Sequence, residues 1–184
     1  ETMASSRTLF FTAYPTQGWD SLPNLSAFLE EWGLKPQSGV LQETDASRVL
    51  TTGDGSASAY LFANVTEDVL TGTYSNLVMP LSTPVERLFT ANNDIVTYSV
   101  VETNDTAYVA STEADVVEEN PETDTHTIVA LAQRYMDNLG KITANVVVDG
   151  SSMSFLSTFV GNSTFSNKSF TTDFVKMLTG TTDT

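Results

Sequence analysis

The four-residue turn Asp149-Gly150-Ser151-Ser152 is the best candidate for chemistry in this chain of 184 residues. It follows Val146-Val147-Val148, a β-branched run that favours a buried strand, and an apolar set at helical spacing begins at Phe155. The α/β folds hold ligands where a central strand ends and a helix begins, and free N–H groups at a helix start suit an anion. We therefore interpret the turn as a candidate ligand-binding site made of Asp149, Gly150, Ser151 and Ser152.

A structural role explains the same residues without a ligand. Ser152 or Ser154 is a good helix cap, worth about 1 kcal/mol, and Gly150 lets the chain turn sharply. Neither a dinucleotide-binding nor a P-loop glycine pattern accompanies the turn. A serine nucleophile would also need a base, and the sequence offers no positioned one. The structural explanation is the stronger of the two.

Other reactive residues are isolated. His126 is the single histidine and the chain has no cysteine, so neither a zinc site nor a catalytic triad is indicated. Residues 113–126 form an acidic segment without the ligand spacing of an EF-hand, which predicts a flexible, solvated loop. We expect no catalytic residue, no metal site and no cofactor, and therefore no enzyme.

The charge of the chain excludes some classes of partner. Lys and Arg total 8 against 23 Asp and Glu, which gives a formal net charge of −15. Such a chain repels phosphate backbones and anionic lipid headgroups, so we expect no nucleic-acid partner and no direct membrane insertion. The sequence contains neither a membrane span nor a signal peptide at Glu1 to Arg7. The chain reads as an excised fragment, and any anchor helices would lie outside it.

The elements that would position the turn are predicted from local patterns. A proline, an apolar stripe and Gly33 predict a helix over 22–34, and the alternating or β-branched runs predict strands. The expected strands are 8–14, 40–43, 60–63, 76–81, 95–103, 107–111, 127–135 and 142–148, with helices at 155–160 and 170–178 and a loop at 51–58. The short apolar run at 127–135 also fits the start of a helix, because periodicity does not distinguish the two over this length, and we take it as a strand. The residues thus predict one open α/β domain over 1–184, whose mixed, largely parallel sheet is flanked by helices and has a β-rich middle segment.

Two segments resemble a known family. Residues 22–34, LPNLSAFLEEWGL, followed by Ser38-Gly39-Val40, resemble the "LPNLNxLLxEYGI…GVVxE" segment of GldG-like auxiliary domains of ABC transporters, a gliding-motility-associated family. Residues 146–157, VVVDGSSMSFLS, then Asn167 and residues 174–180, are similar to that family's "VVVxGDSDFLS…N…LFLNALNWLTG" ending. Departures are Ser152 in place of an acidic residue, Trp32 in place of Tyr and Lys176-Met177 in place of Asn-Trp.

The resemblance implies a fold and a setting. The sheet would be similar to flavodoxin-like and glutamine-amidotransferase-like domains without their catalytic residues, and the family domain normally begins with a further strand and helix. The chain would lie on the extracytoplasmic face of the bacterial cell membrane, tethered by flanking transmembrane helices, beside an ABC permease and ATPase. Its expected function is non-catalytic, through protein–protein or ligand contacts. The alternative is a small-molecule or glycan-binding domain, or a degenerate hydrolase, that uses the turn at 149–152.

Overall fold

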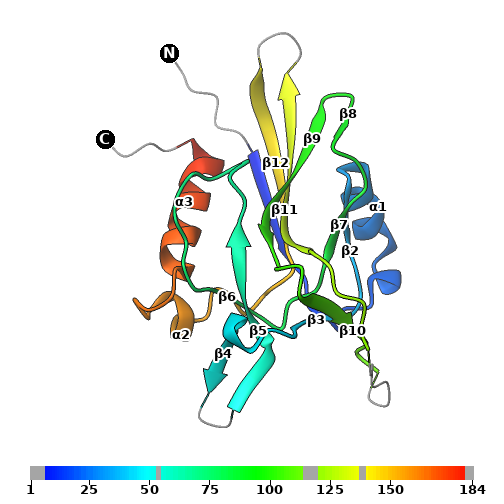
Figure 1. Cartoon of the computed structure of the whole chain (residues 1–184). Helices are drawn as coiled ribbons and strands as arrows, with labels where there is room; N and C mark the ends of the chain where they lie inside the picture. The colour runs from blue at the N-terminus through cyan, green and yellow to red at the C-terminus, as the bar shows by residue number, and fades with distance from the viewer. Residues whose placement is uncertain (1–6, 53–54, 114–119, 137–139, 181–184) are drawn as a thin grey trace.

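The structure is a computed structural model that describes residues 7–52, 55–113, 120–136 and 140–180 (Figure 1). Its helices are α1 (Pro23–Glu31), α2 (Ser157–Val160) and α3 (Asn167–Thr179), with short 3-10 helices η1 (Trp19–Ser21) and η2 (Ala46–Arg48). Its strands are β1 (Arg7–Thr12), β2 (Leu34–Pro36), β3 (Val40–Glu43), β4 (Val49–Thr52), β5 (Gly55–Val65), β6 (Leu77–Pro80), β7 (Val85–Arg87), β8 (Ala91–Asn92), β9 (Ile95–Glu102), β10 (Ala107–Ala110), β11 (Thr127–Met136) and β12 (Lys141–Asp149). No helix in the described part of the chain is long and apolar enough to cross a membrane.

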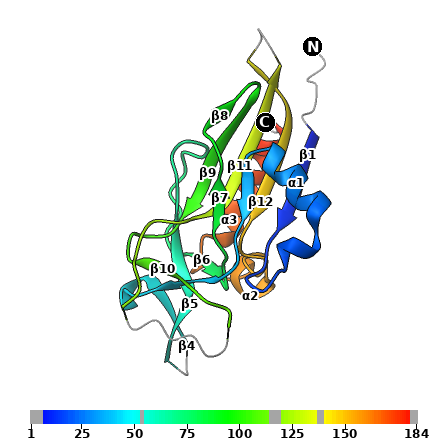
Figure 2. The ribbon, with the colours of Figure 1, turned by 90° about the vertical axis from the view of Figure 1, so that its right-hand side faces the viewer.

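A curled, mixed sheet organises the fold, and its strands run in the order β1-β12-β11-β9-β5-β4. Strand β6 pairs with β5 beside this path, and β8 pairs with β9. The pairing of β1 with β12 is parallel, with Leu9 beside Val146 and Phe11 beside Val148, whereas the other pairings of this sheet are antiparallel. Two further antiparallel pairs, β2 with β7 and β3 with β10, form small sheets of their own; in Figure 2 the first pair lies near the middle of the molecule and the second nearer its lower end.

Strand β12 crosses the interior with both of its faces covered. Val147 packs into a core that contains Phe170 of α3, whereas Val146 and Val148 pack into a second core that contains Leu29 of α1. Because successive residues of a strand point to opposite faces, α3 and α1 cover opposite faces of the sheet (Figure 1). The three valines are no more than 1% exposed, so the predicted buried strand is confirmed.

The helix predicted over 22–34 is confirmed as α1, and its ends have local causes. Pro23 stands in the first turn, where a missing N–H costs nothing because that group has no partner in a helix. Gly33 has a φ of +77°, and a Cβ atom built there would lie 2.6 Å from the ring of Phe89. The chain therefore leaves the helix through a position that only glycine fits, directly into β2.

The predicted fold class is wrong. Strands outweigh helices, and the described sheet is a curled, mostly antiparallel one rather than a helix-flanked, flavodoxin-like or glutamine-amidotransferase-like sheet. One reason is visible in the connection between the neighbouring strands β11 and β12, because β11 ends at Met136 and β12 begins at Lys141. Parallel neighbours need a crossover of about a dozen residues or more, so a connection this short makes the two strands antiparallel.

Two local predictions also differ from the structure. Most of the loop expected over 51–58 is extended, because β4 continues to Thr52 and β5 begins at Gly55, while residues 53 and 54 lie outside the described part. The helix expected over 155–160 contracts to the four residues of α2. By contrast, the last predicted helix is confirmed as α3, and Gly180 follows it with a φ of +65°, the usual left-handed end of a helix.

The acidic segment 113–126 is described only in part, because residues 114–119 lie outside the described residues. Its last residues are fastened to neighbouring strands. The N–H of Asp124 donates to the carbonyl of Ala107 at 2.9 Å, and the N–H of His126 donates to Thr103 Oγ1 at 2.9 Å. This end of the segment is therefore anchored, while the predicted flexibility of the remainder stays a prediction.

Candidate functional site

The turn at 149–152 begins with a buried carboxylate. Asp149 is the last residue of β12 and is 1% exposed. Its Oδ1 accepts a hydrogen bond from the N–H of Ser151 at 2.7 Å, and its Oδ2 accepts one from the hydroxyl of Ser154 at 3.3 Å. Burial raises the pKa of Asp149 from 3.8 to about 7, against the smaller lowering by these two hydrogen bonds. Both oxygens of the carboxyl group are thus used in hydrogen bonds within the turn and with the residues that follow it.

The next two residues of the turn are equally enclosed. Gly150 donates to the carbonyl of Ile128 at 2.8 Å and accepts from the N–H of Thr83 at 2.9 Å. A Cβ atom built on Gly150 would lie 2.1 Å from the Thr83 carbonyl oxygen, so no side chain fits there. The hydroxyl of Ser151, which is fully buried, donates to the carbonyl of Pro80 at 2.7 Å. Ser152, the fourth candidate, is half-buried.

Asn167, the first residue of α3, completes this arrangement. Its Oδ1 accepts from the N–H of Val78 at 3.0 Å, and its Nδ2 donates to the carbonyl of the same residue at 2.8 Å. The Nδ2 also donates to the Ser154 carbonyl at 3.0 Å. The carboxamide therefore pairs with Val78 in the way that a neighbouring strand would.

Together these contacts close the outer edge of β6. Strand β6 pairs with β5 on one side, and on the other side the groups of Val78 and Pro80 meet Asn167 and Ser151. Outward-facing groups of a strand recur at every second residue, which explains why 78 and 80 are the ones reached. The candidate site residues are thus brought together, but around a sheet edge rather than around a cavity. The predicted caps also differ, because α2 begins at Ser157 and no side chain caps it.

A separate pocket of about 650 Å³ lies between the β2–β7 pair, β10 and the start of β11. Apolar side chains cover part of its wall and polar ones the rest. The lining residues are Gln37, Ser38, Pro84, Val85, Glu86, Arg87, Phe89, Thr90, Val109, Thr125, His126 and Thr127. No local sequence pattern marks this pocket, because its wall comes from four separate stretches of the chain.

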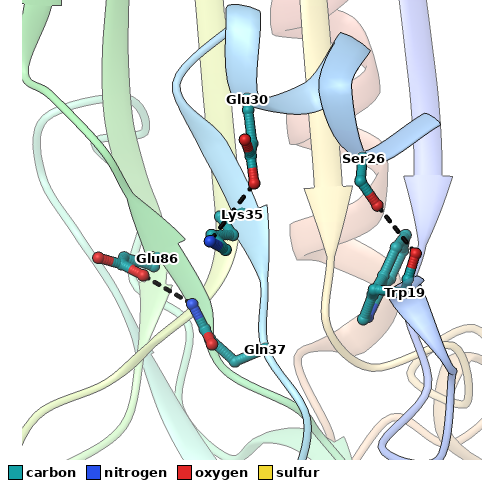
Figure 3. A network of polar contacts seen from close by, with 6 residues as sticks. All are labelled: Trp19, Ser26, Glu30, Lys35, Gln37 and Glu86. Atoms are coloured by element: carbon teal, nitrogen blue, oxygen red, sulfur yellow. Dashed lines mark hydrogen bonds and ion pairs between the residues drawn. The ribbon is translucent and has the colours of Figure 1, made fainter. Parts of the chain in front are cut away.

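Hydrogen bonds hold the polar side chains of the pocket in place. Gln37 follows β2, and its Nε2 donates to Glu86 Oε2 on β7 at 2.6 Å (Figure 3). Arg87 Nη1 donates to the carbonyl of Thr97 on β9 at 3.2 Å. Two groups that are often mobile, a carboxamide and a guanidinium, are therefore oriented by partners on neighbouring strands.

His126, the residue directly before β11, lies on the wall of this pocket. Its Nε2 is buried and has no hydrogen-bonding partner in the described part of the protein. Burial lowers the pKa of His126, and the nearby Asp124 carboxylate opposes this with a smaller rise. The imidazole is therefore neutral near pH 7. Among the described residues no group of three metal-ligating side chains comes together, here or elsewhere.

Comparisons with known proteins give a fold and no family. No protein-family model matches the chain, and no curated protein matches it. Among solved structures it is similar to the mmIFT52 N-terminal domain, with 13% sequence identity and a TM-score of 0.51. The alignment covers 94% of this chain and 64% of the neighbour, so the chain spans just under two thirds of the neighbour's length. At this identity the similarity shows the fold alone.

Proposed function

We propose that this chain is a non-catalytic, extracytoplasmic domain of a GldG-like ABC-transporter auxiliary protein. It acts through contacts with the transporter, whose permease spans the membrane and carries the ATPase, or with an exported ligand, on the outer face of the bacterial cell membrane. Transmembrane helices outside this chain would tether it there. The basis of the proposal is the resemblance of two sequence segments, and the structure adds that these two segments lie together in the fold.

The observation that carries the proposal is that the two segments share a core, and that Thr83 links the second segment to the residues between the two parts of the first. The N–H of Thr83 donates to the Gly150 carbonyl at 2.9 Å, and its hydroxyl donates to the Gln37 carbonyl at 2.6 Å. Gln37 lies between the two parts of the first segment, and Gly150 lies in the second. The segments also share a core, in which Leu29 and Val146 both pack.

The polar residues of the second segment support a non-catalytic role. Asp149, Ser151 and Asn167 are each no more than 1% exposed, and each is bonded to backbone groups of the fold. Because these residues are used within the fold, the surface of the domain rather than this turn would make the functional contacts.

Affinity purification from membranes tests the proposal. The full-length protein, tagged at the end distant from this domain, should be cross-linked in cells of its source organism and recovered from detergent. We expect an ABC permease and its ATPase to be enriched over a control in which this domain is replaced by an unrelated one. Recovery of the transporter subunits in equal amounts with the control, or their repeated absence, would refute the role of the domain.

Use of the 149–152 turn by a small molecule or glycan, or by a degenerate hydrolase, stays a prediction that the geometry does not favour. The side chains of Asp149 and Ser151 are enclosed and already bonded. A thermal-shift screen with sugars and small anions tests it, with Ser152→Ala as the comparison because Ser152 is the more accessible of the turn's two serines. A ligand that stabilises the parent protein but not this variant would revive the turn as a site.

A further inference from the structure

The pocket beside β7 has the dimensions of a ligand site. Its volume of about 650 Å³ falls within the range of roughly 300 to 1,000 Å³ that is usual for small-molecule sites. Its lining comes from β7, from the segment after β2, from β10 and from the start of β11. A molecule of one or two sugar rings would fit within such a volume.

The charges around the pocket favour a neutral occupant. Among the described lining residues, Glu86 and Arg87 are the charged ones, and their formal charges cancel. The chain as a whole carries −15, which repels an anion before it arrives. A cation would meet the positive charge of Arg87 next to Glu86 in the chain, and the Gln37 amide already occupies one oxygen of that carboxylate. Neither an anion nor a cation therefore has an uncompensated counter-charge in the pocket.

The lining of the pocket combines apolar side chains with polar side chains that can form hydrogen bonds. Phe89 and Val109 supply apolar contact, while Gln37 and Arg87 present amide and guanidinium groups that are oriented by hydrogen bonds to Glu86 and Thr97. A carboxamide offers both donors and an acceptor, and each hydroxyl of a ligand can donate and accept in the same way. A sugar ring combines an apolar C–H face with a rim of hydroxyl groups. Because the polar side chains of the pocket are already oriented, binding a ligand costs less of their conformational entropy.

From this combination we propose that the pocket binds a neutral carbohydrate of one or two rings. The apolar face of the ring lies on Phe89 and Val109, and its hydroxyl groups bond to Gln37, Glu86 and Arg87. The occupant is a free sugar or the end of a glycan chain, which share this chemistry. This assignment is independent of the transporter proposal, because it rests on the residues of the pocket and is measured on the isolated domain.

A charge series on one ring tests the ligand class. The ¹⁵N-labelled domain is titrated with glucose, glucosamine and glucose 6-phosphate, and then with maltose, cellobiose, lactose and N,N′-diacetylchitobiose, while amide and His126 ring signals are followed by NMR. We expect at least one neutral sugar to bind with a Kd of about 1 mM or tighter, with shifts centred on residues 84–90 and 125–127. Tighter binding of a soluble glycan polymer than of its disaccharide identifies a glycan end as the natural source, and equal binding identifies a free sugar.

Two variants place the binding in the pocket. Ser38→Trp puts a large side chain at the exposed rim of the pocket and should weaken sugar binding. Ser163→Trp is the matched control, which should leave binding unchanged, because Ser163 is an exposed serine in the turn between α2 and α3. Glu86→Ala removes the partner of Gln37 without touching a buried residue and should weaken binding about tenfold. It also serves as the test if Ser38→Trp does not fold.

Three results would overturn the proposal. The first is the absence of binding by every neutral sugar in the panel. The second is binding that Ser38→Trp and Glu86→Ala leave at the level of Ser163→Trp, which would place the sugar elsewhere. The third is tighter binding of glucosamine or glucose 6-phosphate than of glucose, which would replace the neutral class with a charged one.

Discussion

Replacement of Asn167 by alanine should destabilise the protein far more than the loss of one surface amide would. The side chain is 1% exposed and makes three hydrogen bonds to backbone groups, two with Val78 and one with Ser154. Alanine removes all three partners at once. The N–H and carbonyl of Val78 then face a gap at the outer edge of β6, where the described structure offers them no other partner.

The cost follows from these three groups. A buried backbone group that loses its partner costs about 1–3 kcal/mol, and water entering the gap recovers part of it. We therefore expect Asn167→Ala to lower the free energy of unfolding by about 3–5 kcal/mol. For a domain of this size each kcal/mol shifts the Tm by about 2–4 °C, so the Tm should fall by roughly 10 °C.

Urea unfolding monitored by circular dichroism measures the change, with Asn162→Ala as the control. Asn162 is exposed, and its Oδ1 accepts one hydrogen bond, from the N–H of Thr164 at 3.0 Å, so its loss should cost less than about 1 kcal/mol. Asn167→Asp sharpens the test, because it keeps the acceptor for Val78 but turns an oxygen toward two carbonyls. That variant should regain stability as the pH falls and its carboxyl group becomes a donor. Equal midpoints for Asn167→Ala and Asn162→Ala would refute the edge-closing role.

Three further predictions follow from the same region and from the surface. Gly150→Ala should prevent soluble expression or lower the Tm sharply, because the new Cβ atom would lie 2.1 Å from the Thr83 carbonyl oxygen; a Tm within about 2 °C of the parent would contradict this. Asp149 has its pKa raised by burial from 3.8 to about 7, so the folded state holds this proton more tightly than the unfolded state does. Its contribution to stability is therefore complete below about pH 4 and is lost as the pH rises to 7, on the order of 4 kcal/mol; stability curves of the parent and of Asp149→Asn should diverge over this window, and parallel curves would show that the pKa is not raised. Arg134→Gln removes a guanidinium 4.5 Å from the Trp32 ring, but this group is partly exposed, so denaturant midpoints should report a loss below about 1 kcal/mol.

The positions of elements could be predicted wherever the signal is local. Pro23 and Gly33 mark the ends of α1, and both act through their own backbone geometry. The β-branched run before Asp149 similarly indicates a buried strand, and the structure places it inside the sheet. Strand direction is a different matter, because it depends on the chain between two elements. The short connection from Met136 to Lys141 was the available signal, and it excludes a parallel pair.

The site could be predicted only in part, for a physical reason. A polar cluster after a buried strand is typical of a ligand site, but an open sheet edge attracts the same residue types, because its N–H and carbonyl groups need partners. Pro80 indicates such an edge, since a proline cannot donate to a neighbouring strand on that side. Ser151 and Asn167 meet this demand at β6, and their chemistry is thereby used in the fold. Polar residues at a strand end therefore favour a function only when the backbone of the adjacent strands is already paired, which requires knowledge of the topology.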